Sequence, residues 1–292
     1  MNSQDLTCRR YVLVTRLNLA RTLRSIPVIR RFLPFLVSRL LPNTPVWIQV
    51  RSGISQGMWM RLNPQKDIRL WLGEHEPAVQ SALAAVVVSG MVVYDVGAHV
   101  GIVALGMARL VGRSGRVVAF EPDPESVEDL LENRDRNGFG TSMTVVPSAV
   151  WSYPSSRIGF RRGGERRSHG GVELERHHPV LGTGEVIQVQ AVTLDDFIAA
   201  GGLIPQLIKI DVEGGEHEVL RGGERLFSGQ RPLIVVEVHH KQAADQIQQW
   251  LVGHQYRSRC IRPPEQYPCC LLAWPESLKE GDSMWGNDGS SR

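Results

Sequence analysis

The run Val92–Gly101, with the sequence Val-Val-Tyr-Asp-Val-Gly-Ala-His-Val-Gly, constrains the fold more than any other part of the chain. An apolar stretch ends at Asp95, glycines follow at positions 97 and 101, and a helical pattern begins after the second glycine. This succession predicts a buried β-strand, a tight turn and a helix N-terminus, the first unit of a doubly wound α/β domain. Gly97 allows the backbone to turn without a Cβ, and we expect Gly101 to let the helix pack close to the strand.

Asp95 holds the position that decides which cofactor such a unit binds. A dinucleotide fingerprint has glycine there, because the pyrophosphate lies against bare backbone. A carboxylate at that point repels paired phosphates. It suits a cofactor that carries positive charge, such as the sulfonium and amino groups of S-adenosylmethionine. The motif therefore favours S-adenosylmethionine over a nicotinamide dinucleotide.

Strand and helix patterns alternate along the rest of the chain, which predicts an α/β fold built on a parallel sheet. The strand that ends at Asp95 is followed by predicted strands at 117–121, 143–146, 207–211 and 232–238. Helices are predicted at 76–88, 101–110, 124–137, 193–198, 216–221 and 243–251. Thr193 is the expected N-cap of its helix, with Asp196 three residues further on.

Changes in composition predict four regions. Residues 1–45 form a basic amphipathic helical segment, and residues 46–75 a β-hairpin lead-in that covers the edge of the domain. Residues 76–275 form the main domain, and the polar residues 276–292 a disordered tail. Within the main domain, residues 152–185 are rich in arginine and predict an irregular loop or a strand pair with a long connection. That insertion is interpreted either as a substrate cover with affinity for an anionic acceptor or as a solvated, mobile segment.

The net charge of +3 is unevenly distributed. Residues 1–41 hold eight Arg and one Asp, an excess of +7, so the remainder carries 3 − 7 = −4. A mildly acidic main domain argues against a nucleic-acid partner. Residues 11–41 combine helical apolar spacing with interleaved arginines and two prolines, so they form either a helical cap docked on the domain or a peripheral contact with an anionic membrane surface. The segment resembles neither a signal peptide nor a spanning helix, since arginines recur throughout it.

The cysteines point to a reducing compartment, and we expect a cytoplasmic location, with membrane association left open. The chain has four of them and no C-x-x-C spacing, which argues against a zinc site and against a disulfide framework. They are Cys8, Cys260, Cys269 and Cys270. Nothing in the sequence fixes the oligomeric state.

Titratable residues follow the predicted strands at their carboxyl ends, where ligands bind in open α/β sheets. Glu121 ends the second strand, at the position that accepts hydrogen bonds from ribose hydroxyls. Lys209 and Asp211 end one later strand, and Glu237 and His239 end another. For Lys209 two interpretations stay open: a buried ion pair with one of the carboxylates, or a catalytic role.

Four motifs together resemble FkbM-type methyltransferases over residues 92–240. They are Asp95-Val96-Gly97-Ala98-His99-Val100-Gly101, Phe120-Glu121-Pro122-Asp123-Pro124, Ile208-Lys209-Ile210-Asp211-Val212-Glu213-Gly214-Gly215-Glu216 and Val236-Glu237-Val238-His239. The resemblance implies a class I methyltransferase (Rossmann-like) fold, with a largely parallel seven-stranded sheet, an antiparallel last strand and helices on both faces. It also implies methyl transfer from S-adenosylmethionine to a hydroxyl oxygen of a small molecule or glycan: a sugar, a glycolipid or polysaccharide precursor, or a secondary metabolite. His99 stands where the family often has Asn, and Gly215 where Ala is frequent.

The resemblance also assigns site residues. The methionine end of the cofactor is expected among Asp95, Gly97, Ala98, His99 and Gly101. Glu121 is expected to hold the ribose, with Ser148 and Ala149 lining the adenine. Asp211 is the candidate that faces the reacting centre, and Asp211, Glu213 or His239 is expected to accept the proton of the acceptor hydroxyl.

Three alternatives accompany this interpretation. We expect that no metal is needed, but the first alternative includes one. In it, magnesium or manganese is held by Asp211, Glu237 and His239 and lowers the pKa of the acceptor hydroxyl. In the second, the chain is a nicotinamide-dependent oxidoreductase, which shares the layout and Glu121 but conflicts with Asp95. In the third, it is a non-catalytic binding module that keeps the Rossmann-like fold.

Overall fold

The computed structural model describes residues 41–163, 171–172, 184–261 and 267–278. These divide into two compact units, one of residues 41–46 with 62–68, the other of residues 47–61 with 69 onward. In the first unit the side chain of Asn63 organises a turn: its Oδ1 accepts from Gln65 N at 3.0 Å, and its own N donates to Asp67 Oδ2 at 2.8 Å. The second unit holds the predicted α/β domain.

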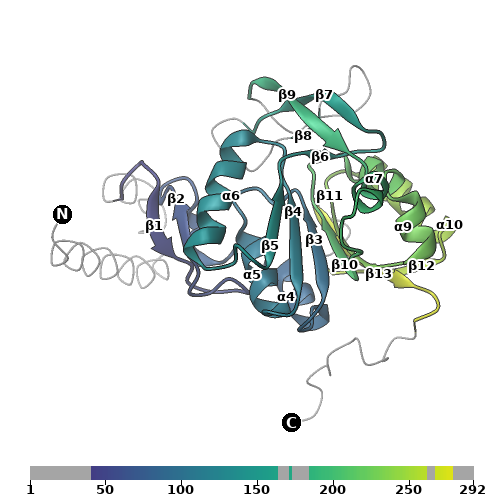
Figure 1. Ribbon diagram of the computed structural model, residues 1–292, viewed down its shortest axis with the longest axis horizontal. Coiled ribbons are helices and arrows are strands. Elements are labelled where there is room, and N and C mark those ends of the chain that lie inside the picture. Colours follow the sequence, from purple (N-terminus) through teal and green to yellow (C-terminus); the bar gives the residue numbers. More distant parts are fainter. Residues whose placement is uncertain (1–40, 164–170, 173–183, 262–266, 279–292) are drawn as a thin grey trace, which may run out of the picture. The chain divides into compact units, whose positions relative to one another are not determined.

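A seven-stranded sheet forms the centre of this second unit (Figure 1). Its order is β12-β13-β11-β10-β3-β4-β5, and the pairs β11/β10, β10/β3, β3/β4 and β4/β5 are all parallel. β13 pairs antiparallel with both of its neighbours. The strands are β3 Val92–Val96, β4 Arg116–Phe120, β5 Met143–Val146, β10 Leu207–Ile210, β11 Leu233–Val238, β12 Tyr256–Cys260 and β13 Cys269–Pro275. The expected largely parallel sheet with an antiparallel last strand is therefore confirmed.

Helices cover both faces of the sheet (Figure 1), as expected. They are α4 Pro77–Val86, α5 Ile102–Val111, α6 Pro124–Arg136, α7 Leu194–Ala199, α8 Glu216–Arg221, α9 Glu224–Gly229 and α10 Lys241–Gly253. One face buries alternate strand residues, such as Tyr94, Ile208 and Val236, against α8, α9 and α10. Tyr94 and Phe120 there stack edge-on with Phe197 of α7. The residues of opposite parity face the other helical layer, and among them are Asp95, Lys209 and Glu237.

The order of the strands reverses between β3 and β10. From β3 the chain builds outward through β4 and β5 on one side, and β10 and β11 lie on the other. In an open parallel sheet the crevice outside the carboxyl ends at such a switch is where ligands bind. The loops after Val96 and Ile210 flank this crevice, so both halves of the predicted site lie at one edge.

The arginine-rich insertion contributes to a second, four-stranded sheet of order β6-β9-β7-β8. Its strands are β6 Ala149–Val150, β7 Ser155–Arg161, β8 Gly171–Val172 and β9 Val186–Val192, and β7 pairs antiparallel with β9. Within residues 152–185, β7 also pairs antiparallel with β8, and this confirms the strand-pair form of the prediction. Trp151 packs with Ile158 and Val189 into a small core of its own. Figure 1 shows this sheet beyond the ends of β3–β5.

The predicted hairpin exists, and asparagine side chains fasten it to α6. β1 Val46–Gln49 and β2 Trp59–Leu62 form a two-stranded sheet. Asn137, at the end of α6, accepts from Trp59 N at 2.9 Å and donates to Trp59 O at 2.7 Å, as a neighbouring strand would. Asn133 accepts from Arg61 N at 2.7 Å and donates to Val100 O at 2.9 Å. The hairpin is thereby tied to the loop after β3.

Most predicted elements agree with the structure to within a few residues, including the Thr193 cap, whose side chain accepts from Asp196 N at 2.9 Å. Two short helices, α3 Ile68–Leu72 and α9, were not predicted from the sequence. The amphipathic segment up to residue 40, with its membrane contact, and the tail from residue 279 lie outside the described residues. The domain boundaries at 45, 75 and 275 stay predictions. In the described part of the chain, the search for a helix long and apolar enough to cross a bilayer finds none.

Candidate functional site

Gly97 lies where the two halves of the crevice approach most closely. A Cβ built on it would lie 1.8 Å from the carbonyl oxygen of Asp211, and its φ is +83°. Both facts exclude a side chain, so the predicted need for glycine is confirmed. Gly101 has φ +90°, and its Cβ would lie 2.3 Å from Leu130 Cδ1 of α6. We expected Gly101 to allow close packing of the helix against the strand. That expectation was wrong, because the close neighbour of Gly101 is Leu130 of the helix α6.

The turn after β3 presents its backbone to Glu121. Gly97 N and Ala98 N both donate to Phe120 O at 3.0 Å. His99 N donates to Glu121 Oε2 at 2.8 Å, and Asp123 N donates to Oε1 at 2.9 Å. His99 has φ +48°, a conformation that Asn and His adopt more readily than most residues, which accounts for His99 replacing the expected Asn. Two residues predicted to bind the cofactor are thus joined directly.

Asp95 is fully buried, and its cationic partner is a lysine of this chain. Lys209 Nζ lies 3.3 Å from Asp95 Oδ1 and 3.3 Å from Asp211 Oδ2, and it donates to Gly97 O at 3.3 Å. Lys209 is paired with Asp95 in the sheet register, so the pleat places both side chains on one face. Of the two interpretations left open for Lys209, the buried ion pair is the one observed. The charge of Asp95 is therefore largely compensated inside the protein.

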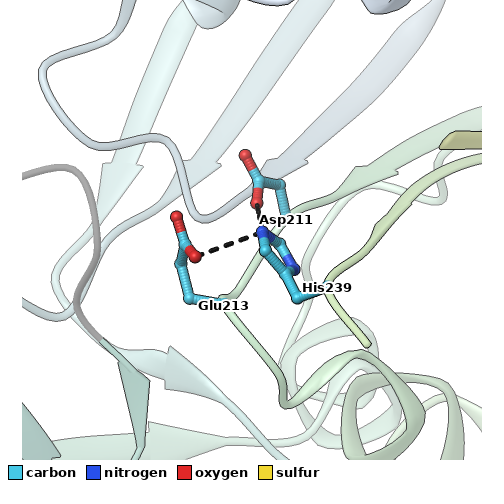
Figure 2. Close-up of side chains that lie close together, drawn as sticks. All are labelled: Asp211, Glu213 and His239. Carbon is cyan, nitrogen blue, oxygen red and sulfur yellow. Dashed lines mark ion pairs between the residues drawn. The ribbon is translucent and has the colours of Figure 1, made fainter. Parts of the chain in front are cut away.

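The acceptor side of the crevice gathers side-chain charges. His239 Nε2 lies 3.1 Å from Glu213 Oε2 and 3.5 Å from Asp211 Oδ1 (Figure 2). The other ring nitrogen, Nδ1, lies 2.8 Å from Oε1 of Glu216, which is completely buried at the start of α8. Glu216 Oε1 also accepts from Gly214 N at 2.9 Å. The three residues predicted to be catalytic therefore lie together, and Glu216 fixes the orientation of the imidazole ring.

The pKa values of these groups all lie above their ordinary values, for the carboxyl groups mainly because of burial and for His239 because of its carboxylate neighbours. Burial raises the pKa of Asp95 to about 6, against the opposing charge of Lys209. Burial, with the charges of Asp211 and Glu237, raises the pKa of Glu213 to about 8. Burial alone would lower the pKa of His239, but the hydrogen bond that its Nδ1–H donates to Glu216 and the charges of the neighbouring carboxylates raise it to about 10. At neutral pH His239 is therefore a cation and has no free lone pair for a proton.

Ser148 and Ala149 follow β5, which is parallel to β4, so they lie at the same edge of the sheet as Glu121. Both are buried. Ser148 N donates to Val146 O at 2.8 Å, which turns the chain out of the main sheet, and Ala149 opens β6 of the second sheet. Their expected position beside an adenine stays a prediction.

Gly215 differs from the alanine frequent in the family for a local reason. A Cβ at this position would lie 2.5 Å from Cζ3 of Trp151, whose side chain is almost fully buried. The indole therefore occupies the space that an alanine methyl would need. Trp151 belongs to the second sheet, so the loop after β10 and that sheet are packed together.

Two residues that contribute to the site were not predicted from the sequence. Glu76, the N-cap of α4, is buried and its charge acts on Lys209, Asp95 and Glu237. No sequence pattern links it to residues more than a hundred positions away. Asp123 contacts Arg162, as described below. Its place in the Glu-Pro-Asp-Pro sequence predicts a helix cap, which it is, but carries no sign of its distant partner.

Two groups of side chains among the described residues bring ligand atoms within 4.8 Å of one another, as a metal ion would require. One is Asp211, Glu213 and His239; the other is Glu76, Asp211 and Glu237. The trio expected in the metal variant, Asp211, Glu237 and His239, is divided between them. In the first group the ion pairs of His239 also account for the convergence.

Residues 95–258 match a family described as the methyltransferase FkbM domain. The hexuronic acid methyltransferase AglP of Haloferax volcanii is 29% identical over 150 residues, which are 51% of this chain and 56% of that protein. The 31-O-demethyl-FK506 methyltransferase FkbM of Streptomyces tacrolimicus is 32% identical over 190 residues, 57% of this chain and 73% of that one. The match to the first relative thus spans little more than half of its length.

Solved structures are more distant. The FkbM methyltransferase of Methylobacillus flagellatus superposes with a TM-score of 0.47 at 19% identity, over 63% of this chain and 44% of that one. Aeropyrum pernix fibrillarin, solved with S-adenosylmethionine bound, gives a TM-score of 0.44 at 12% identity, over 68% and 75%. The fold assignment given above depends on the strand order of this chain itself.

Proposed function

The chain belongs to the FkbM methyltransferase family, and from this we propose that it transfers a methyl group from S-adenosylmethionine to a hydroxyl oxygen of a small-molecule or glycan acceptor. The observation that carries the proposal is the match over residues 95–258, which includes both edges of the crevice. The family's chemistry makes S-adenosylmethionine the cofactor, as Asp95 had suggested. The nicotinamide alternative is not favoured.

Two relatives support the proposed acceptor class. One is named for a hexuronic acid and the other for a demethylated FK506, both hydroxyl-bearing compounds. We propose an oxygen acceptor of the same kind: a sugar, a glycolipid or polysaccharide precursor, or a secondary metabolite. Its identity is open to a screen in which labelled S-adenosylmethionine is incubated with fractionated cell extract and this protein. The membrane contact of residues 11–41 and the cytoplasmic location also stay predictions.

The reaction is an in-line displacement, so most of the catalysis consists of aligning the two reactants. The acceptor oxygen forms a bond to the methyl carbon while the S–CH3 bond breaks, and its electron pair returns to sulfur to give S-adenosylhomocysteine. The hydroxyl proton must go to a base. Of the three candidates we propose Glu213, because a carboxyl whose pKa is about 8 is a stronger base than an ordinary one and ionises close to working pH.

The other two candidates then hold Glu213 in place. His239, a cation at neutral pH, lies 3.1 Å from Glu213 Oε2 and stabilises that carboxylate once Glu213 ionises. Asp211 lies 3.5 Å from His239 and 3.3 Å from Lys209, so its charge balances both cations. In this assignment Asp211 and His239 position the base and the acceptor without taking the proton. Glu216 keeps the imidazole directed at Glu213.

The metal variant makes a different prediction. If magnesium or manganese lowered the acceptor pKa at Asp211, dialysis against a chelator would abolish turnover, and either ion would restore it. With Glu213 as the base, turnover persists in the chelator. Atomic emission of the purified protein gives a second, activity-independent measurement.

One experiment tests the proposed function as a whole. Isothermal calorimetry of the full chain with S-adenosylmethionine, S-adenosylhomocysteine and NAD should show binding of the first two and none of NAD. Tight binding of NAD alone would contradict the proposal and revive the oxidoreductase. Binding of S-adenosylmethionine with no methyl transfer to any fraction would favour the non-catalytic binding module.

A further inference from the structure

Arg162 lies just beyond β7, in the arginine-rich insertion, yet its side chain contacts the loop after β4. Its Nε lies 3.0 Å from Asp123 Oδ2 and its Nη2 2.8 Å from Asp123 Oδ1, while Nη1 lies 3.0 Å from Glu125 Oε1. The Asp123 side chain is only 9% exposed. A two-pronged guanidinium–carboxylate pair at this burial differs from the screened surface pairs that contribute little.

Asp123 is in turn coupled to Glu121. Its backbone N donates to Glu121 Oε1 at 2.9 Å, and its Oδ1 accepts from Glu125 N at 2.9 Å as the N-cap of α6. Arg162 is itself fixed, since its N donates to Glu185 O and its O accepts from Gly184 N. A continuous chain of hydrogen bonds therefore runs from the second sheet through Asp123 to Glu121.

The residues of this hydrogen-bonded chain also influence one another through their charges. Burial raises the pKa of Glu121 to about 7; the N–H groups of Asp123 and His99 and the charge of Lys209 lower it, and the charge of Asp123 raises it. Arg162 compensates Asp123 and Glu125 from the far side. Removal of the guanidinium would leave the full charge of Asp123 acting on Glu121 across two residues.

We propose that Arg162 is a positioning residue for the cofactor: it holds Asp123 and cancels its charge, so that Glu121 keeps the place and the charge that the ribose hydroxyls require. The inference rests on the proposed function, since it takes Glu121 as the ribose ligand. It gives this one arginine of the insertion a role at the cofactor, whereas the sequence suggested either a cover for an anionic acceptor or a solvated, mobile segment.

The test is calorimetry of S-adenosylhomocysteine binding to the full chain between pH 6 and pH 9. Wild-type affinity should fall as the pH drops through 7. In Arg162→Gln the fall should begin about one pH unit higher, so that binding is roughly tenfold weaker than wild type at pH 6 and nearly equal at pH 9. Arg157→Gln, at an exposed arginine of β7, is the matched control and should follow the wild-type curve.

Two further variants separate charge from structure. Arg162→Gln combined with Asp123→Asn removes both charges, keeps a good helix cap, and should return the pH curve to that of wild type. Arg162→Lys should rescue the curve in part, because lysine supplies charge without the two-pronged contact. A loss of affinity that is equal at every pH and survives in the double variant would overturn the inference. Failure of the wild type to bind at any pH would instead overturn the proposed function.

Discussion

The two edges of the crevice are built from different kinds of polar group. On the β3/β4 edge, glycine turns expose backbone N–H groups, and both oxygens of Glu121 accept from them. On the β10/β11 edge the polar groups are charged side chains, and His239 forms ion pairs with Asp211, Glu213 and Glu216. Backbone donors fix a shape with no change of charge, which suits a constant cofactor. Side-chain ions can gain and lose protons, which suits the edge where a proton must be moved.

The side chain of Lys209 joins the two edges through ion pairs with Asp95 and Asp211. Its replacement should therefore have the largest effect. Lys209→Met leaves a wholly buried carboxylate without its cation and should lower the free energy of unfolding by about 3–5 kcal/mol in urea denaturation. Lys241→Met, at an exposed lysine of α10, is the control.

The Lys209→Met and Asp95→Asn double variant should recover much of that loss, because no lone charge remains at Asp95. If Lys209→Met were as stable as wild type, the two edges would not be coupled through this residue. The β3/β4 edge and the β10/β11 edge would then lie side by side without sharing one network of charges.

Glu213→Gln should affect the chemical step and leave cofactor binding unchanged, which would separate the functions of the two edges. It removes the proposed base and keeps the shape, so kcat should fall by about 10²–10³-fold while the dissociation constant of S-adenosylhomocysteine stays within about twofold of wild type. Glu185→Gln, at an exposed glutamate, should change neither quantity. Unchanged kcat would remove Glu213 from the mechanism, and parallel tests of Asp211→Asn and His239→Gln would show whether another group takes the proton.

Glu121→Gln should give the opposite pattern on the other edge. An amide places a donor group against the N–H of His99 or Asp123 and loses the charge, so S-adenosylhomocysteine should bind about 10- to 100-fold more weakly. The kcat at saturating cofactor should change little. Glu128→Gln, exposed on α6, serves as the control. A fall in kcat with unaltered binding would place Glu121 on the chemical step.

The smallest effect expected is a separation of two pH curves. Glu121 must be ionised for binding, so affinity should rise with pH through about 7, and Glu213 must be ionised to accept a proton, so kcat should rise through about 8. Between pH 7 and 8 the kcat should therefore increase about fivefold while affinity increases only about twofold. Titration of His239 near 10 should end the kcat plateau. Coincident curves would mean that one group governs both steps.

The sequence was most informative where the cause of structure is local. Thr193 caps its helix and Gly97 makes its turn because these depend on neighbouring backbone, and the alternation of elements dictates a parallel sheet. It also located the catalytic candidates at strand ends. It erred on the packing partner of Gly101, which is Leu130, and could not anticipate Glu76, since both depend on which helix covers the sheet.

The sequence alone determined the class of fold, the edge of the sheet that carries the site and the family of the chain, because periodicity and short motifs encode them residue by residue. Only the tertiary structure decided which charges meet. It placed Lys209 between Asp95 and Asp211, surrounded His239 with three carboxylates and joined Arg162 to Asp123. In most of these pairs the two residues lie far apart in the chain. The pKa values of these residues depend on burial and on distances between charges, and both are set only when the sheet and its helices have packed.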